Sequence, residues 1–517
     1  MSAATMPSNS KVKMEGESAM GRQVLKSTTC AAVAAALFAV VIFVAPIARA
    51  QGGQGQDKSA PLSQVQRLNR APVNKEILRV QLPRPKIETL PNGLTLVLQE
   101  DHKLPTIAFT MWIRPGQLAD PADLPGLASS TAEMLREGTE RRTSAQIAEE
   151  VDRLGASLDG ASRFGASYTS VNASGLINST PQILDLMSDV VLHPAFPNSE
   201  LEKYKQREEA GLESRLANPN FLGQQAFRRV LYGDTAMAIT SPTKESLEKL
   251  TVEDLKRFHD KHFVPGNTIL GVTGDFKADE MRAMVEKYFG GWKGAAEAAV
   301  SYPAAAPQAT KITLVDRPAS VQTYIVGGNR GIRRVDPDYY GLVVMNQIEG
   351  GGPQARLFLD LREEHSLTYG SYSRFNADIY PGDWFAFAPV RTTVTGDAME
   401  RFVFEFKRIN NEPVAQSELD DAHRAIIANF ALSLEQPAQL LNDWLTVQHF
   451  GLPMDYWDKY PDHIGAIDAA GVQAAAKRFV DLGHMQWVAV GDRKQIQDSL
   501  AKYGPVTVID VTGKAEN

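Results

Sequence analysis

The feature of this sequence that most limits its possible folds is a pair of landmarks that occurs twice. Gly126-Leu127 follows a strand-like run, and Gly341-Leu342 follows another such run 215 positions later. A second strand-like run ends in Gly274-Asp275, and its counterpart ends in Gly491-Asp492, 217 positions later. Two landmarks at nearly the same offset indicate a duplicated domain of roughly 200 residues.

Each half of the repeat mixes strands and helices. Alternating apolar residues predict strands over 94–99 and 107–113. Helical periodicity predicts helices over 143–154, 181–192, 199–216 and 251–263, the last with a capping box of Thr251 and Asp254. Strands come in pairs and helices in runs, which favours an α+β fold over regular parallel α/β alternation.

Residues 1–50 are typical of a signal peptide. Arg22 and Lys26 precede the uncharged run 28–48, and Ala-Arg-Ala at 48–50 places small residues where signal peptidase requires them. We therefore expect export to the periplasm, with cleavage after Ala50. The alternative is an uncleaved membrane anchor, because 21 uncharged residues are long enough to span a bilayer of roughly 30 Å.

Composition narrows the possible partners and chemistry. The net charge of −7 argues against a nucleic-acid partner, because phosphate binding needs a basic surface. The only cysteine, Cys30, lies in the apolar run. If the signal is removed, the mature chain has neither disulfides nor thiolate chemistry.

Two polar or Ala/Pro-rich stretches divide the remaining chain. Residues 51–84 begin with a Gly- and Gln-rich stretch and are expected to form a flexible leader. Residues 293–310 are rich in Ala and Pro, as in an interdomain linker. The predicted domains are therefore 85–292 and 311–508.

The two halves carry motifs that resemble one known family. NGLTLVLQEDHKLPTIAFTMWIRPGQLADPADLPGLASSTAEMLREGT, LGASLDGASRFGASYTSVNASGL and GGGPQARLFLDLREEHSLTYGSYS are similar to motifs of the insulinase/pitrilysin zinc peptidases, in the same order. The resemblance covers about residues 85–505. It implies two homologous domains, each a mainly antiparallel sheet covered by helices, which together form half of a clamshell.

The zinc motif of that family is degenerate in this chain. Catalytic members carry an inverted H-x-x-E-H motif, whose histidines hold zinc and whose glutamate is the general base. The resemblance puts Ser129 and Glu133 at the histidine positions and Ala132 at the position of the base. Glu133 is either a catalytic carboxylate or, as we expect, a solvated or salt-bridged helix residue.

The third ligand position is degenerate as well. Aligning SRLANP with the later helix of the family puts Gly211 there. A change of register would bring Glu208, Glu209 or Glu213 to the same position. Serine is a poor zinc ligand, and alanine and glycine have no donor atom. We therefore expect this chain to bind no metal.

Three histidines are weaker candidates. His259 and His262 are spaced as a metal pair on a helix could be, but no third ligand is evident. His262 falls on an apolar face, so we expect core or surface histidines. His365 is expected to be an isolated loop residue.

Arg362 and Tyr369 match the Arg/Tyr pair of the family, which binds the substrate backbone beside the scissile bond. Guanidinium and phenol groups are hydrogen-bond donors suited to a carbonyl that gains negative charge. The alternative is that Arg362 pairs with Glu363 or Glu364 and that Tyr369 is a core strand residue. The glycines at 350–352 are expected to form a tight turn.

A lost zinc site beside a retained pair predicts the non-catalytic subunit of a periplasmic heterodimeric peptidase, inactive alone. The partner would carry H-x-x-E-H and zinc, and the substrates would be unfolded peptides. Such peptides would add to the edge strand within residues 158–168. One alternative is a peptide-binding or assembly scaffold without a peptidase role. Another is an active peptidase with unusual ligands.

Overall fold

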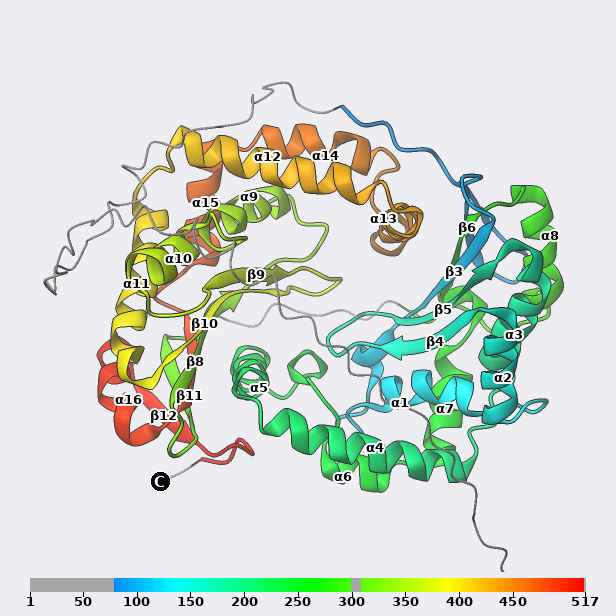
Figure 1. Cartoon of the computed structure of the whole chain (residues 1–517), viewed down its shortest axis with the longest axis horizontal. Helices are drawn as coiled ribbons and strands as arrows, with labels where there is room; N and C mark the ends of the chain where they lie inside the picture. The colour runs from blue at the N-terminus through cyan, green and yellow to red at the C-terminus, as the bar shows by residue number, and fades with distance from the viewer. Residues whose placement is uncertain (1–78, 299–307, 516–517) are drawn as a thin grey trace, which may run out of the picture. The chain divides into compact units, whose positions relative to one another are not determined.

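The computed structural model describes residues 79–298 and 308–515, all within the compact unit Val65–Asn517 (Figure 1). The predicted signal peptide and most of the predicted leader lie outside the described residues. None of the helices in the described ranges is long and apolar enough to cross a membrane.

Two six-stranded sheets organise the described chain, one in each half of the sequence repeat. The first has the order β1-β2-β6-β3-β5-β4 and the second β12-β7-β11-β8-β10-β9. Only β2/β6, β7/β11 and β7/β12 are parallel, so both sheets are mainly antiparallel, as predicted. The first-sheet strands are β1(Lys86–Thr89), β2(Thr95–Glu100), β3(Thr106–Ile113), β4(Ser157–Ser162), β5(Thr169–Leu176) and β6(Thr268–Gly274). The second-sheet strands are β7(Lys311–Asp316), β8(Gln322–Arg330), β9(Tyr372–Asn376), β10(Asp383–Arg391), β11(Gln486–Gly491) and β12(Val506–Ile509).

Helices cover both sheets. The first half contains α1(Leu127–Met134), α2(Ser144–Leu154), α3(Thr180–Leu192), α4(Asn198–Leu216), α5(Pro219–Tyr232), α6(Lys244–Lys249), α7(Val252–His262) and α8(Ala278–Phe289). The second contains α9(Tyr339–Glu349), α10(Arg356–Phe358), α11(Thr395–Asn411), α12(Gln416–Ser433), α13(Pro437–Phe450), α14(Tyr456–Gly465), α15(Ala469–Phe479) and α16(Arg493–Leu500). The predicted strands and helices are confirmed to within two residues. The capping box at Thr251 is also confirmed, and Thr143 with Gln146 forms a second one.

The duplication is confirmed by the strand order. Strands β2, β6, β3, β5 and β4 of the first sheet correspond to β7, β11, β8, β10 and β9 of the second. Only the outermost strand differs. In the first sheet it is β1, which precedes the repeat and is antiparallel to β2; in the second it is β12, which follows the repeat and is parallel to β7.

The two halves exchange one helix each, which the sequence did not predict. Helix α5 of the first half packs on β8 and β11, and α13 of the second half packs on β2 and β6 (Figure 1). Glycines permit both close approaches. A Cβ on Gly223 would lie 2.3 Å from the Tyr324 ring, and one on Gly271 would lie 2.9 Å from Leu441.

Gly223→Ala is therefore expected to destabilise the protein. In a helix alanine is normally more favourable than glycine. Here the contact with the Tyr324 ring outweighs that preference and makes the substitution destabilising. We expect a loss of about 2 kcal/mol in the free energy of unfolding, as in other overpacked cores. Denaturant titration measures it. The control is Gly291→Ala, since nothing lies within 4 Å of a Cβ at Gly291. Equal stability of the two variants would contradict the packing argument.

The described end of the predicted leader, residues 79–84, is fixed to the second half rather than flexible. Leu82 is 2% exposed and belongs to the core of the second half. Its amide donates to Asp458 Oδ1 over 3.0 Å, and Arg84 pairs with the same carboxylate. The Arg84 guanidinium also lies over the Trp444 ring, 5.1 Å from its centroid. The buried Leu82 side chain and the two contacts to Asp458 thus hold this segment in place.

Candidate functional site

Helix α1 carries the degenerate zinc motif, and its start is firmly held. Gly126 precedes it with φ +95°, a conformation that favours glycine. The buried Asp120 accepts hydrogen bonds from the amides of Gly126 and Ala128, at 2.7 and 2.8 Å. Burial raises the pKa of Asp120 to about 7. At the other end, Gly160 of β4 lies so close that a Cβ there would be 2.4 Å from the Ala132 carbonyl.

One of the residues at the motif positions, Glu133, forms an ionic contact with α4. Ala132 is fully buried, whereas Ser129 and Glu133 are half-buried. Ser129 Oγ lies 3.5 Å from Glu133 Oε1, and Arg207 of α4 lies 3.8 Å from Glu133 Oε2. Burial and the nearby charge of Glu208 raise the pKa of Glu133. Glu133 is thus salt-bridged, as expected, and it is also partly desolvated.

The third ligand position is surrounded by paired charges. A Cβ on Gly211 would lie 3.3 Å from Arg215 Nη1, so the Arg215 side chain passes directly over this glycine. Arg215 in turn pairs with Glu208 at 3.2 Å, and Glu209 pairs with Lys244 at 2.9 Å. The carboxylates that a change of register could supply at 208 and 209 are therefore bound to basic side chains.

Zinc does not fit this donor set. One carboxylate and one hydroxyl on α1 face a glycine, two guanidinium groups and the ion-paired carboxylate of Glu208 on α4, whereas a zinc site needs three or four N, S or O ligands. Sequence reasoning did not single out Arg207 and Arg215. Their spacing from Gly211, four residues on either side, was the available signal, because it places all three on one helix face.

Restoring two histidines should not restore a metal site. The variant Ser129→His/Glu133→His has only two ligands, because Gly211 supplies none, and we expect close to zero zinc per chain after gel filtration. Adding Gly211→Glu supplies a third ligand and should bring the content toward one. Atomic absorption measures both. A zinc content near one per chain in both variants would mean that another group, first of all Glu208, completes the site.

His259 and His262 are core histidines. Both are buried; His259 Nε2 lies 2.8 Å from the Val191 carbonyl, and His262 Nδ1 lies 2.5 Å from Glu297 Oε1. Burial lowers the pKa of each. The two rings are thus engaged with different neighbours.

The expectation that His365 is isolated is wrong. Within residues 79–298 and 308–515, Asp360, Glu364 and His365 form the one group of three potential ligands close enough to hold a metal. His365 Nδ1 lies 2.7 Å from Asp360 Oδ1. However, both oxygens of Asp360 already accept N–H groups of Arg401, at 2.7 to 3.0 Å. The cluster is therefore a structural ionic contact.

Arg362 and Tyr369 lie on the surface. Tyr369 is 89% exposed, so the alternative of a core strand aromatic is wrong. Arg362 lies 3.4 Å from Glu363, with both side chains over 40% exposed, and its guanidinium lies 4.7 Å from the centroid of the Phe358 ring. An exposed ion pair of this kind is worth little. Both donors are thus accessible to another molecule.

A buried Ser/His/Asp set joins the two halves but is not a hydrolase triad. Ser167 Oγ donates to Asp378 at 2.5 Å and lies 2.8 Å from His449 Nε2. In a catalytic triad the histidine lies between serine and aspartate, whereas here the serine lies between the other two. Burial lowers the pKa of His449 to about 3, so the ring is neutral at physiological pH.

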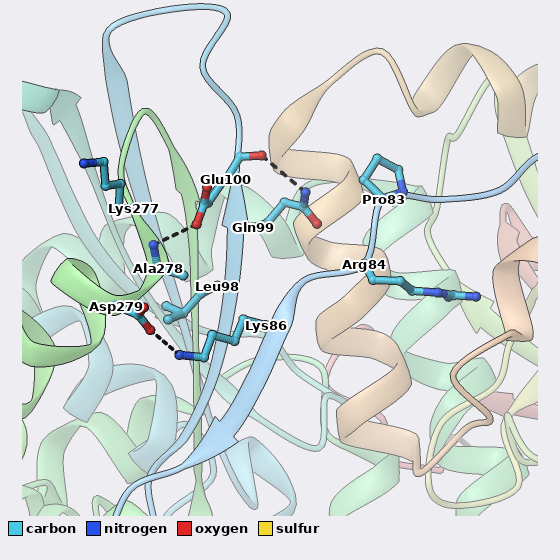
Figure 2. A pocket seen from close by; sticks show the side chains of 9 residues that line it. All are labelled: Pro83, Arg84, Lys86, Leu98, Gln99, Glu100, Lys277, Ala278 and Asp279. Carbon is cyan, nitrogen blue, oxygen red and sulfur yellow. Dashed lines mark hydrogen bonds and ion pairs between the residues drawn. The ribbon is translucent and has the colours of Figure 1, made fainter.

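A pocket of about 680 Å³ beside β1 and the start of α8 is lined by charged side chains that contact other groups of this chain (Figure 2). Lys86 pairs with Asp279 at 2.6 Å, and Glu100 accepts the Ala278 amide at 2.8 Å. These contacts account for the local charges, so this pocket is a weaker candidate than the α1/α4 site and the Arg362/Tyr369 pair.

Two family models match the chain. Residues 95–238 match the model described as insulinase (peptidase family M16), and residues 249–426 match the one described as peptidase M16 inactive domain. A Bacillus subtilis protein described as an uncharacterized zinc protease, YmxG, is 22% identical over 348 residues, 67% of this chain and 84% of that protein. A Helicobacter pylori protein described as the non-peptidase homolog YmxG is 22% identical over 77% of this chain and 92% of that protein.

Solved structures share the fold. A structure described as a peptidase M16 inactive domain from Pseudomonas fluorescens aligns with a TM-score of 0.74 and 26% identity, over 79% of this chain and 98% of that chain. A protease structure from Helicobacter pylori aligns with a TM-score of 0.73 and 16% identity, over 79% and 100%. The two models together match more than half of the sequence. This chain therefore belongs to the insulinase family of peptidases, M16.

Proposed function

We propose that this chain is the non-catalytic subunit of a periplasmic insulinase-family peptidase complex. A partner chain carries H-x-x-E-H and holds zinc, and this chain presents Arg362 and Tyr369 to the peptide bound there. The observation that carries the proposal is a contrast. The zinc-motif helix faces a glycine and two arginines, while the Arg/Tyr pair is exposed with only a weak ion pair to Glu363.

The pair is suited to stabilising a peptide bond that is being hydrolysed. During hydrolysis the carbonyl oxygen gains negative charge, and donors aimed at that oxygen lower the barrier. A guanidinium supplies up to five N–H groups and a phenol one O–H. In this role both residues act on a substrate whose reacting carbonyl lies in the partner's site.

Unfolded peptides are the proposed substrates, because an open sheet edge recognises backbone rather than fold. Among the described strands, β4 is the last of its sheet and pairs with β5 alone. An extended peptide adds to such an edge through main-chain hydrogen bonds. Arg136 Nη1 donates to the Leu158 carbonyl of this strand over 3.2 Å. Because that carbonyl is already occupied, the peptide would pair with the backbone groups of β4 that follow Leu158.

The test is affinity purification of the tagged chain from its envelope fraction, followed by mass spectrometry and a peptide hydrolysis assay. We expect a near one-to-one partner with an intact H-x-x-E-H motif. The pair of chains should hydrolyse unfolded peptides, and this chain alone should not. Recovery of the chain alone, or with partners lacking that motif, would refute the proposal and favour the peptide-binding or assembly scaffold. Hydrolysis by the isolated chain with stoichiometric zinc would instead favour an active peptidase with unusual ligands.

A further inference from the structure

The segment that carries Arg362 has an unusual backbone. Residues Leu359–Glu364 form a π-helical turn, in which the His365 amide donates to the Asp360 carbonyl at 3.1 Å. π-Helical turns are rare and occur frequently at functional sites. Just beyond it, Ser366 has φ +52°, which is unfavourable for a residue other than glycine. Such a conformation persists only where its surroundings enforce it.

The structure assigns Asp360 as the positioning residue of the Arg362/Tyr369 pair: its buried carboxylate fixes the turn that presents both side chains. The effect of Asp360 on peptide hydrolysis rests on the function proposed above, whereas its contacts within the turn do not. Asp360 is 4% exposed, and its two oxygens accept three hydrogen bonds from Arg401 of α11, at 2.7 to 3.0 Å. Planar two-point contacts between arginine and carboxylate fix orientation as well as distance.

The same carboxylate closes the turn on its far side. His365 Nδ1 lies 2.7 Å from Asp360 Oδ1 and 3.0 Å from the Asp360 carbonyl. One buried side chain therefore holds the turn to α11 and ties His365, the residue that follows the turn, back to the start of the turn. Arg362 projects from the middle of this turn, lies over the ring of the buried Phe358 and forms an exposed ion pair with Glu363. The backbone from which it projects is set by Asp360.

The chain between the two members of the pair is held as well. The buried Leu367 donates its amide to the Leu361 carbonyl at 2.8 Å. Thr368 Oγ1 donates to the Pro389 carbonyl at 2.5 Å, and the Thr368 backbone forms an antiparallel bridge with Val390 of β10. Tyr369 therefore leaves the protein surface from a fixed point, and the strained Ser366 lies between two attached residues, His365 and Leu367.

The first arm of the test uses the isolated full chain and needs no partner. Hydrogen exchange of residues 359–369 is compared in the wild type, in Asp360→Asn, and in Glu400→Gln, an exposed acid next to Arg401. We expect at least tenfold faster exchange in this segment for Asp360→Asn, no change for Glu400→Gln, and unchanged exchange in the sheet strands. Unaltered exchange in the segment would overturn the assignment. If Asp360→Asn does not fold, Arg401→Lys takes its place, with the same two outcomes.

The second arm uses the native complex and a double-mutant cycle. Asp360→Asn should lower kcat about tenfold with little change in KM, and this loss should become clearly smaller when Arg362 is already alanine, because only the effect through Tyr369 then remains. Loss of an equal factor in both backgrounds would mean that Asp360 does not act through Arg362, and would overturn the assignment. If Arg362→Ala itself has no effect on turnover, the proposed function fails, and the exchange experiment still decides the positioning role.

Discussion

Replacing Arg362 by alanine is expected to lower kcat/KM of the two-chain peptidase about 10²-fold while leaving the chain folded and bound. A loss of this size is typical when one hydrogen-bond donor to a developing oxyanion is removed. It corresponds to about 2.7 kcal/mol of transition-state stabilisation. Stability should change little, because the side chain is 45% exposed and its ion pair with Glu363 is a surface one.

Variants of the pair separate charge from geometry. Arg362→Lys keeps the charge but loses the planar fork, so we expect most of the loss to remain. Tyr369→Phe keeps the ring and removes the donor, and should give a smaller loss than Arg362→Ala. Arg391→Ala, at the exposed end of β10, is the control. The measurement is steady-state hydrolysis by the purified complex, with co-purification of the partner as a check. Full activity of Arg362→Ala in an intact complex would eliminate the assigned role.

Replacing Glu349 by glutamine is expected to stabilise the chain by about 3 kcal/mol at pH 7. Glu349 is fully buried at the end of α9, and neither carboxylate oxygen has a hydrogen-bond partner among residues 79–298 and 308–515. Burial, and then the charge of Glu405, raise its pKa from an ordinary 4.5 to about 8. Between these two values the folded protein must hold a proton that the unfolded chain releases, so wild-type stability falls as the pH rises from 4.5 toward 8.

Glutamine removes this proton uptake and keeps the side chain's shape. Arg356 keeps its ion pair with both oxygens of Glu418, at 2.8 and 2.9 Å, so the substitution leaves no unpaired buried cation. Denaturant titrations at pH 5 and pH 7 test the prediction. The gain should be about 1 kcal/mol at pH 5 and about 3 kcal/mol at pH 7. Glu400→Gln on α11 should show no such pH dependence. A gain that is equal at both pH values would mean that Glu349 is ionised in the folded protein.

Local features were predictable where short-range chemistry decides them. The capping box at Thr251 and the ends of β3 and β6 follow from side chains within a few residues, and the structure confirms them. The duplication was visible because both halves keep the same strand and turn residues at one offset. The exchange of α5 and α13 was not visible. Their apolar faces suit either sheet, and only the close approach at Gly223 and Gly271 shows which sheet each helix covers.

The candidate site also has features that the sequence predicts and features that only the structure shows. The absence of zinc ligands at Ser129, Ala132 and Gly211 is a property of residue types, so the sequence determined it alone, as it determined the family and the α+β repeat. Which charges fill that site, and how Arg362 is held, depend on residues far apart in the chain. Asp360 meets Arg401 41 positions away, and Glu133 meets Arg207 on another helix. Long-range ion pairs leave no periodic signal, because their geometry is set by the packing of whole helices, and so only the tertiary structure decided them.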